Sequence, residues 1–206
     1  MKKAGIGMMV AALMTGWVWG VSALGQAEPG AEAPDFTLPD TTGASHTLSD
    51  NRGSYVVLEW TNYDCPFVVK HYREGHMQRL QRELTRQGVV WLSVCSSAPG
   101  LQGHFDAETW ARRMEAWDVA SKAVLLDPDG TVGRAYGATH TPHMYVIDPD
   151  GTLLYAGAID SIRSTRPADV DKAGNYVIMA LERARAGLPV DPARTRADGC
   201  TVKYAP

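Results

Sequence analysis

The chain has 206 residues, with 20 lysine and arginine residues against 23 aspartate and glutamate residues, so its formal net charge is −3. Apolar residues make up 45% of the chain, which excludes a disordered protein and suffices for one globular domain with a buried core. The lack of a basic excess argues against a nucleic-acid-binding protein, because such proteins must neutralise phosphates.

The first 27 residues have the pattern of a targeting segment. Lys2 and Lys3 precede an uncharged stretch at residues 4–24, and the first acidic residue is Glu28. Small residues after the stretch fit a signal-peptidase site, and the stretch is also long enough to span a bilayer uncleaved. We therefore expect residues 1–27 to be a signal peptide or an N-terminal membrane tether. Both interpretations place the folded part in the periplasm or otherwise outside the cytoplasm.

The remaining pattern predicts an α/β fold, because strands and helices alternate and then give way to a hairpin. We assign residues 28–190 to one domain and residues 191–206 to a C-terminal tail. In chain order we expect a hairpin at 36–48, a buried strand at 55–61, a helix at 66–87, a strand at 89–95, a helix at 104–117, strands at 123–126, 144–147 and 153–157, and a helix at 173–184.

The three cysteines are Cys65, Cys95 and Cys200. Disulfides persist outside the cytoplasm, but an odd number of cysteines leaves at least one thiol free, transient or shared with a partner. Three cysteines are also too few to stabilise a domain of this size through a framework of disulfide bonds. We interpret them as residues that take part in chemistry.

Cys65 stands where a working site is expected. It follows the carboxyl end of the strand at 55–61, the edge at which sheets of this kind hold their sites. Pro66 suits the first turn of a helix, so Cys65 falls at the helix N-terminus, where partial positive charge favours a thiolate. A thiolate attacks disulfides and peroxides. A buried, inert cysteine is the alternative interpretation.

Two long segments resemble the redoxin group that includes alkyl hydroperoxide reductases and thiol-specific antioxidant proteins. They are residues 33–38 with Asp40, Gly43 and Leu48, and residues 136–148 with 150–151 and 155–157. The resemblance covers about residues 34–160. It implies a thioredoxin-like fold over residues 28–190, with a central mixed sheet flanked by helices and an N-terminal β-hairpin extension.

Around the nucleophile the chain departs from both motifs of that group. Cys65-Pro66-Phe67-Val68 resembles a thioredoxin C-x-x-C in which Val68 replaces the second cysteine, and Asn62 stands where peroxiredoxins have threonine. The chain thus resembles a peroxiredoxin-like subgroup that keeps only the first thioredoxin cysteine. The implied function is exchange with a protein or small-molecule thiol or disulfide, with no cofactor. The alternatives are a thiol peroxidase acting on peroxide and a non-catalytic module that binds a peptide or a metal.

Glu59 is an acidic residue in an otherwise apolar strand. Burial of a carboxylate is costly and raises its pKa towards neutrality. Glu59 lies six residues before Cys65, where thioredoxins place their buried aspartate, so the resemblance implies a role in proton transfer. The alternative is a glutamate that points to an edge or pairs with a lysine or arginine.

Thr141-Pro142 resembles the cis-proline loop that faces the nucleophilic cysteine and offers its backbone to an extended substrate. A trans turn proline is the alternative. With Trp60 and Pro66, these two residues form the substrate-binding set that we expect.

Other polar residues near these motifs are assigned to ordinary positions. His140 and His143 flank the proline and could form a metal site with Cys65, but histidines at this spacing are more often simple polar groups, so we expect no metal. Lys70 and His71 are expected on a solvated helix face.

The lack of a sulfur at Val68 leaves a mixed disulfide on Cys65 to be resolved from elsewhere. The candidates are Cys200, Cys95 and an external thiol. Cys95 is held on a strand, whereas Cys200 lies in a tail that can move, and closing so long a loop adds little entropic cost. We therefore predict that Cys200 forms a disulfide with Cys65 under oxidation, which adds Cys200 to Cys65 and Glu59 as a catalytic candidate.

Overall fold

The computed structural model describes residues 26–206. The targeting segment predicted at residues 1–27 therefore lies almost entirely outside the described residues. Within residues 26–206, no helix is both long and apolar enough to cross a membrane.

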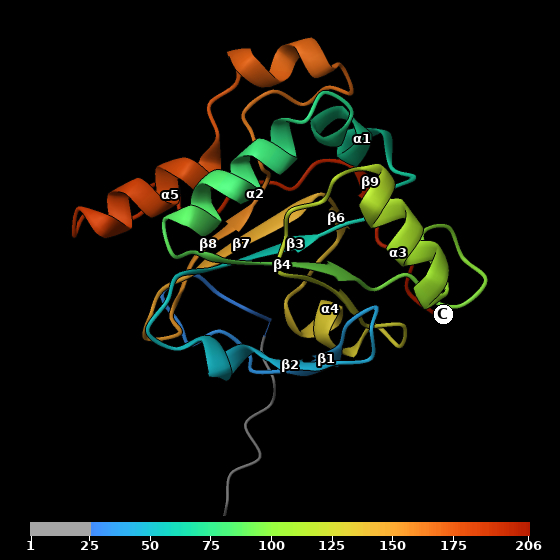
Figure 1. Ribbon diagram of the computed structural model, residues 1–206. Coiled ribbons are helices and arrows are strands. Elements are labelled where there is room, and N and C mark those ends of the chain that lie inside the picture. Colours follow the sequence, from blue (N-terminus) through green and yellow to red (C-terminus); the bar gives the residue numbers. More distant parts are fainter. Residues whose placement is uncertain (1–25) are drawn as a thin grey trace, which may run out of the picture.

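A five-stranded mixed sheet forms the centre of the molecule (Figure 1). Its strand order is β5-β4-β3-β7-β8. β3 runs parallel to β4, and β4 to β5, whereas β7 is antiparallel to both β3 and β8. The bounds are Val56–Trp60 for β3, Val90–Cys95 for β4, Ala123–Leu126 for β5, His143–Ile147 for β7 and Leu153–Gly157 for β8. The predicted α/β architecture with a mixed sheet is confirmed.

Helices α1, α2 and α5 lie on one side of the sheet, and α4 lies on the other with the hairpin β1–β2 (Figure 1). α3 also belongs to the first side, because its Trp110 joins the core beneath α1 and α2. The bounds are Pro66–Tyr72 for α1, His76–Arg86 for α2, Ala107–Ala116 for α3, Thr131–Ala135 for α4 and Tyr176–Arg185 for α5. Two 3₁₀ helices are η1 at Leu48–Asn51 and η2 at Pro167–Lys172.

The N-terminal hairpin has the predicted form. β1 (Thr37–Pro39) pairs with β2 (Ser45–Thr47) in antiparallel register. The single helix predicted at 66–87 is instead two helices. Gly75, with a φ of 73°, separates α1 from α2, because a left-handed residue cannot continue a right-handed helix.

Strand β3 is buried on both faces and divides the core. Val57 and Glu59 point towards α1 and α2, whereas Val56, Leu58 and Trp60 point towards the hairpin. This alternation follows from the two-residue period of a strand. It places the carboxyl group of Glu59 in the same layer as α1, the helix that follows Cys65.

The expectation that Lys70 and His71 are solvated is wrong. Lys70 is only 3% exposed, and its Nζ donates hydrogen bonds to Asp160 Oδ2 at 2.8 Å and to the carbonyl of Ile162 at 2.9 Å. Burial lowers the pKa of His71 to about 4, despite the nearby Asp160 carboxylate. The reason is tertiary, since α1 packs against η2 and the chain after β8 covers this helix face.

Removing the partner of Lys70 tests this buried ion pair. Asp160→Ala leaves a buried ammonium with no counter-charge, so we expect the free energy of unfolding to fall by about 3 kcal/mol in urea denaturation. The matched control is Glu108→Ala, which breaks the exposed pair with Arg112 and should change stability by less than about 0.5 kcal/mol. Equal midpoints for the two variants would contradict the assignment.

Candidate active site

Cys65 occupies the N-cap of α1, as its position before Pro66 predicts. Its carbonyl accepts the first intrahelical bonds, from the N–H groups of Val68 and Val69 at 2.9 Å each. Pro66 occupies the first helical turn and is exposed. The thiol of Cys65 is fully buried, at 0% exposure. The helix therefore fixes the backbone of Cys65 beyond the carboxyl end of β3, and other segments must cover its sulfur.

One of these segments is the loop before β7. The Thr141–Pro142 peptide bond is cis, as the resemblance implied. Thr141 ends β6 (His140–Thr141), and its carbonyl accepts a hydrogen bond of 3.1 Å from Cys65 Sγ. The β3–β7 register explains this meeting, since it pairs Trp60 with His143 and so ends both strands at one edge.

The other segment is the C-terminal tail, which the structure holds against the domain. β9 (Cys200–Thr201) pairs antiparallel with β6, so that Cys200 lies opposite Thr141. The backbone N–H of Cys200 donates to Cys65 Sγ over 3.4 Å. The sequence predicts a tail that can move, and in this arrangement the tail is paired with β6 and holds Cys200 beside Cys65. Burial, together with a hydrogen bond to the Cys65 thiol, raises the pKa of the Cys200 thiol to about 12.

Cys95 has different surroundings. It ends β4, is buried, and donates its S–H to the carbonyl of Gly103 at 3.3 Å. Burial raises the pKa of this thiol above its ordinary value. Its hydrogen bond thus ties Cys95 to a nearby loop, whereas the backbone N–H of Cys200 meets the Cys65 sulfur directly.

Glu59 is fully buried among neutral hydrogen-bond donors. Tyr72 donates its hydroxyl to Oε1 at 2.9 Å, and Oε2 accepts from Trp91 Nε1 at 2.9 Å and from Ser93 and Gln81 at 3.2 Å each. Burial raises the pKa of Glu59 to about 7, and the hydrogen bonds from Trp91, Tyr72, Ser93 and Gln81 hold it from rising further. The carboxyl group therefore titrates near neutral pH.

Glu59 and Cys65 meet opposite ends of α1. Tyr72, which binds the carboxyl group, is the last residue of that helix, and Cys65 is its N-cap. Seven residues of helix separate them by roughly 10 Å of rise. The hydrogen bonds of Cys65 go to Thr141 and Cys200 instead. Glu59 thus supports the helix that presents Cys65, and a proton passing between the two needs an intermediate carrier.

The structure contradicts the substrate contact expected of Trp60. This side chain is fully buried on the hairpin side of the sheet, opposite to Cys65. Its Nε1 donates to Ser96 Oγ at 2.9 Å, and its ring packs against Tyr136 and Tyr145. Trp60 therefore stabilises the sheet edge from within the core.

The histidines beside Pro142 make separate contacts. His143 Nδ1 accepts from the N–H of Thr139 at 3.4 Å, and burial lowers the pKa of His143 to about 3. Nδ1 of His140 lies 2.9 Å from Thr139 Oγ1. Across residues 26–206, no group of three or more histidine, cysteine, aspartate or glutamate side chains has an arrangement that could hold a metal ion.

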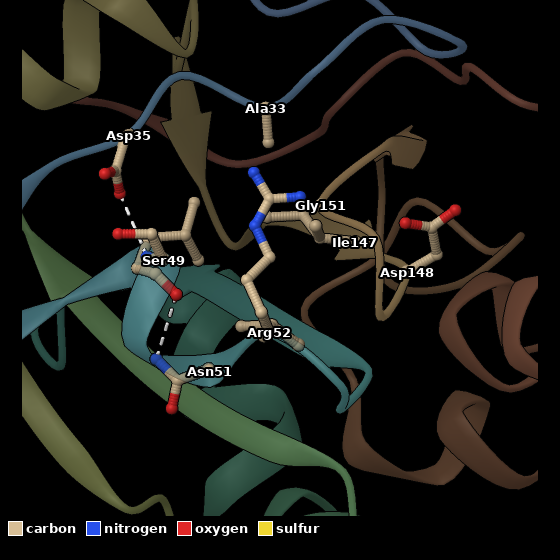
Figure 2. A pocket seen from close by; sticks show the side chains of 10 residues that line it. Ala33, Asp35, Ser49, Asn51, Arg52, Ile147, Asp148 and Gly151 are labelled. Carbon is tan, nitrogen blue, oxygen red and sulfur yellow. Dashed lines mark hydrogen bonds between the residues drawn. The ribbon is translucent and has the colours of Figure 1, made fainter.

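A small pocket lies elsewhere, where η1 meets the turn after β7 (Figure 2). Arg52 extends through the pocket towards Ala33 and Gly151 (Figure 2). Its guanidinium donates a hydrogen bond to Glu32 at 2.7 Å. The volume of the pocket, about 10 Å³, is at the limit for one water molecule. No thiol lines it, so it belongs to the packing of the N-terminal segment.

Two tail residues at the site were missed in the sequence. Gly199 lies against the carbonyl of Thr141, and Tyr204 donates its hydroxyl to the carbonyl of Ala138 at 2.7 Å. Two features of the sequence could have indicated them. Gly199 directly precedes Cys200, and Tyr204 is an aromatic residue near the end of a polar tail.

The raised pKa of Glu59 predicts a pH-dependent stability. The unfolded chain ionises near 4.5 and the folded chain near 7, so the stabilising contribution is complete below pH 4.5 and is lost as the pH rises through 7. Relative to Glu59→Gln, which does not titrate, we expect the native chain to lose roughly 3 kcal/mol of unfolding free energy between pH 4 and pH 8. Urea titrations of both proteins measure this difference, and parallel curves would exclude it.

Residues 29–156 match the AhpC/TSA family. The thiol-disulfide oxidoreductase ResA of Geobacillus thermodenitrificans is 30% identical over 124 residues, which are 60% of this chain and 66% of that protein. The chain thus spans slightly less than two thirds of the length of that relative.

Solved structures share the fold. An uncharacterized conserved protein from Geobacillus kaustophilus aligns with a TM-score of 0.76 and 25% identity, over 87% of this chain and 93% of that one. The thioredoxin domain of a thiol-disulfide oxidoreductase from Bacteroides vulgatus aligns with a TM-score of 0.51 and 21% identity, over 71% and 98%. The thioredoxin-like fold implied by the sequence is therefore confirmed, and the chain belongs to the AhpC/TSA family.

Proposed function

We propose that this chain is an exported thiol–disulfide oxidoreductase that acts through Cys65. One observation supports this most strongly. The sulfur of Cys65 lies at a helix N-cap between the carbonyl of Thr141, next to the cis proline, and the backbone N–H of a second cysteine, Cys200. A thiol, a backbone edge and a second thiol thus meet at one place. The similarity to a protein named as a thiol-disulfide oxidoreductase agrees with this chemistry.

The first step is attack by the Cys65 thiolate on one sulfur of a substrate disulfide. The substrate S–S bond breaks, a new S–S bond joins Cys65 to the substrate, and the other substrate sulfur leaves as a thiolate that takes up a proton. The substrate is a protein or small-molecule disulfide. In the reverse direction the same groups oxidise a dithiol.

The second step is resolution by Cys200. Its thiolate attacks the Cys65 sulfur of the mixed disulfide, which releases the substrate as a second thiol and leaves a Cys65–Cys200 disulfide. An external dithiol then supplies two electrons to restore both thiols. In the closed, reduced arrangement the pKa of Cys200 is raised to about 12, so Cys200 does not attack first. Formation of the mixed disulfide removes the Cys65 thiol that contributes to this raised pKa.

Glu59 holds a proton near the working pH. Its pKa of about 7 allows its protonation state to change near neutral pH. Tyr72 is the group that joins Glu59 to α1, because its hydroxyl contacts both carboxylate oxygens. We assign Glu59 as a positioning residue that acts on the thiol through this helix.

Removing Cys65 and Cys95 separately tests the assignment of the nucleophile. We expect Cys65→Ser to abolish the acceleration that the protein gives to the reduction of insulin disulfides by dithiothreitol, because Cys65 is the thiol at the helix N-cap beside the cis proline. The Cys95→Ser variant should keep most of the rate, because the Cys95 thiol is hydrogen-bonded to the carbonyl of Gly103. Equal losses in the two variants would place the nucleophile elsewhere.

Mild hydrogen peroxide distinguishes the alternatives in the same samples. Rapid consumption of peroxide with sulfenate on Cys65, and no insulin reduction, would make the chain a thiol peroxidase of its family. A Cys65 that reacts with neither substrate would make it a binding module.

Peptide mapping of the oxidised, unreduced protein tests the resolving step. We expect a Cys65–Cys200 cross-link after treatment with oxidised glutathione, because β9 holds Cys200 opposite Thr141, whose carbonyl contacts Cys65. Cys95→Ser should give the same cross-link. If Cys200 remained fully alkylatable while Cys65 was blocked, resolution would depend on an external thiol.

A further inference from the structure

The last residues of the chain cover the nucleophile. We call residues 199–204 the strap. Within it, β9 forms a two-residue ladder with β6, and Val202 donates its N–H to the carbonyl of Thr139 at 3.0 Å. Cys65 is fully buried although it stands at the sheet edge. The strap is one reason, because the N–H of Cys200 points directly at the Cys65 sulfur.

The end of the strap is anchored on α4. Tyr204 donates its hydroxyl to the carbonyl of Ala138, and the guanidinium of Arg134 lies 4.4 Å from the centre of the Tyr204 ring. A Cβ atom at Gly130 or Gly133 would overlap this ring. Two glycines thus leave the space that the ring fills, which makes Tyr204 a specific anchor.

The start of the strap depends on close backbone approach. Gly199 has a φ of 151°, in the range that favours glycine. A Cβ atom on Gly199 would overlap the carbonyl oxygen of Thr141, the same oxygen that accepts the hydrogen bond from Cys65. Only a residue without a side chain lets the strap lie this close to β6.

The strap nevertheless lies outside the five-stranded sheet, and besides the contacts above it is held by the N–H of Ala98, which donates to the carbonyl of Lys203 at 2.8 Å. β9 has two residues, Thr201 is exposed, and the ion pair that precedes the strap, between Asp198 and Arg163, is partly exposed at 3.3 Å. Short edge strands with exposed hydrogen bonds open at a lower free energy than the core of a protein. The strap can therefore leave β6 while the sheet remains folded.

We propose that the strap is a displaceable cover that controls access to Cys65. It occupies the edge of β6, where an extended polypeptide would form the same main-chain hydrogen bonds. A protein substrate must therefore replace the strap as a strand before its disulfide reaches the sulfur. The close contact at Thr141 favours a substrate with a small residue at the position of Gly199. The identity of the substrate rests on the proposed function, whereas the control of access does not.

The rate at which Cys65 is alkylated tests the proposal. In a full-length Cys95→Ser/Cys200→Ser background, Cys65 is the single thiol of the chain. N-ethylmaleimide and a maleimide carried on polyethylene glycol serve as the small and the bulky probe. We expect Gly199→Ala to raise both labelling rates by about tenfold, which corresponds to about 1.4 kcal/mol in the opening equilibrium.

The matched control is Gly187→Ala. Gly187 also has a positive φ, of 69°, but a Cβ there meets nothing within 4 Å. The Gly187→Ala substitution should leave the labelling rate of Cys65 within twofold of the rate in the parent protein. A tenfold increase in this variant would show that general loosening, rather than release of the strap, exposes the thiol.

Tyr204→Ala tests the strap if Gly199→Ala does not fold. This variant removes the ring that packs against Gly130 and Gly133, and it introduces no clash in β9. We expect faster labelling of Cys65 and faster hydrogen exchange at the Val202 amide, with unchanged exchange in β4. Unchanged labelling in folded Tyr204→Ala and Gly199→Ala would overturn the proposal.

The rate of insulin reduction separates this proposal from the proposed function. It is measured for the Gly199→Ala and Tyr204→Ala proteins with Cys200 retained. Faster labelling without any insulin reduction would support the strap and overturn the oxidoreductase. Insulin reduction with unchanged labelling would support the oxidoreductase and overturn the strap.

Discussion

Antiparallel pairing of β3 with β7 joins the two parts of the chain that carry the site. The register places Trp60 opposite His143, at the last position of the ladder. The chain therefore leaves β3 towards Cys65 at the same edge where it enters β7 from Thr141. A slip of one residue would turn Glu59 to the hairpin face and separate the Cys65 sulfur from the Thr141 carbonyl, 76 residues further along the chain.

The tail completes what this edge begins. In a thioredoxin-like C-x-x-C both sulfurs come from one helix turn, whereas here Val68 occupies the second position. β9 brings Cys200 to the site from the end of the chain. A second thiol on a short strand can move with that strand, while a second thiol on a helix cannot. Covering the nucleophile and supplying its partner thus belong to the same segment, and release of the strap affects both.

Buried polar groups hold the surroundings of this edge in place. Glu59 is satisfied by the hydroxyl of Tyr72 and by side chains of β4 and α2, so its carboxyl group connects three elements. Lys70 and Asp160 connect α1 to the chain after β8. Both sets end on α1, the helix whose N-cap is Cys65. Unpaired, each group would destabilise the fold, so their hydrogen bonds also restrict where α1 can lie.

Local patterns in the sequence were sufficient for the α/β order except for the short helix α4, and for the hairpin, the bounds of β5 and β8, and the place of Cys65 before a helix. Periodicity, turn residues and Pro66 determine such features within a few neighbouring positions. The tertiary structure alone decided which side chains are covered. It buried Lys70 and His71, turned Trp60 into the core, broke the long helix at Gly75 and laid Cys200 across β6. These outcomes depend on contacts between segments far apart in the chain, and no local pattern encodes which distant segment will cover a given face.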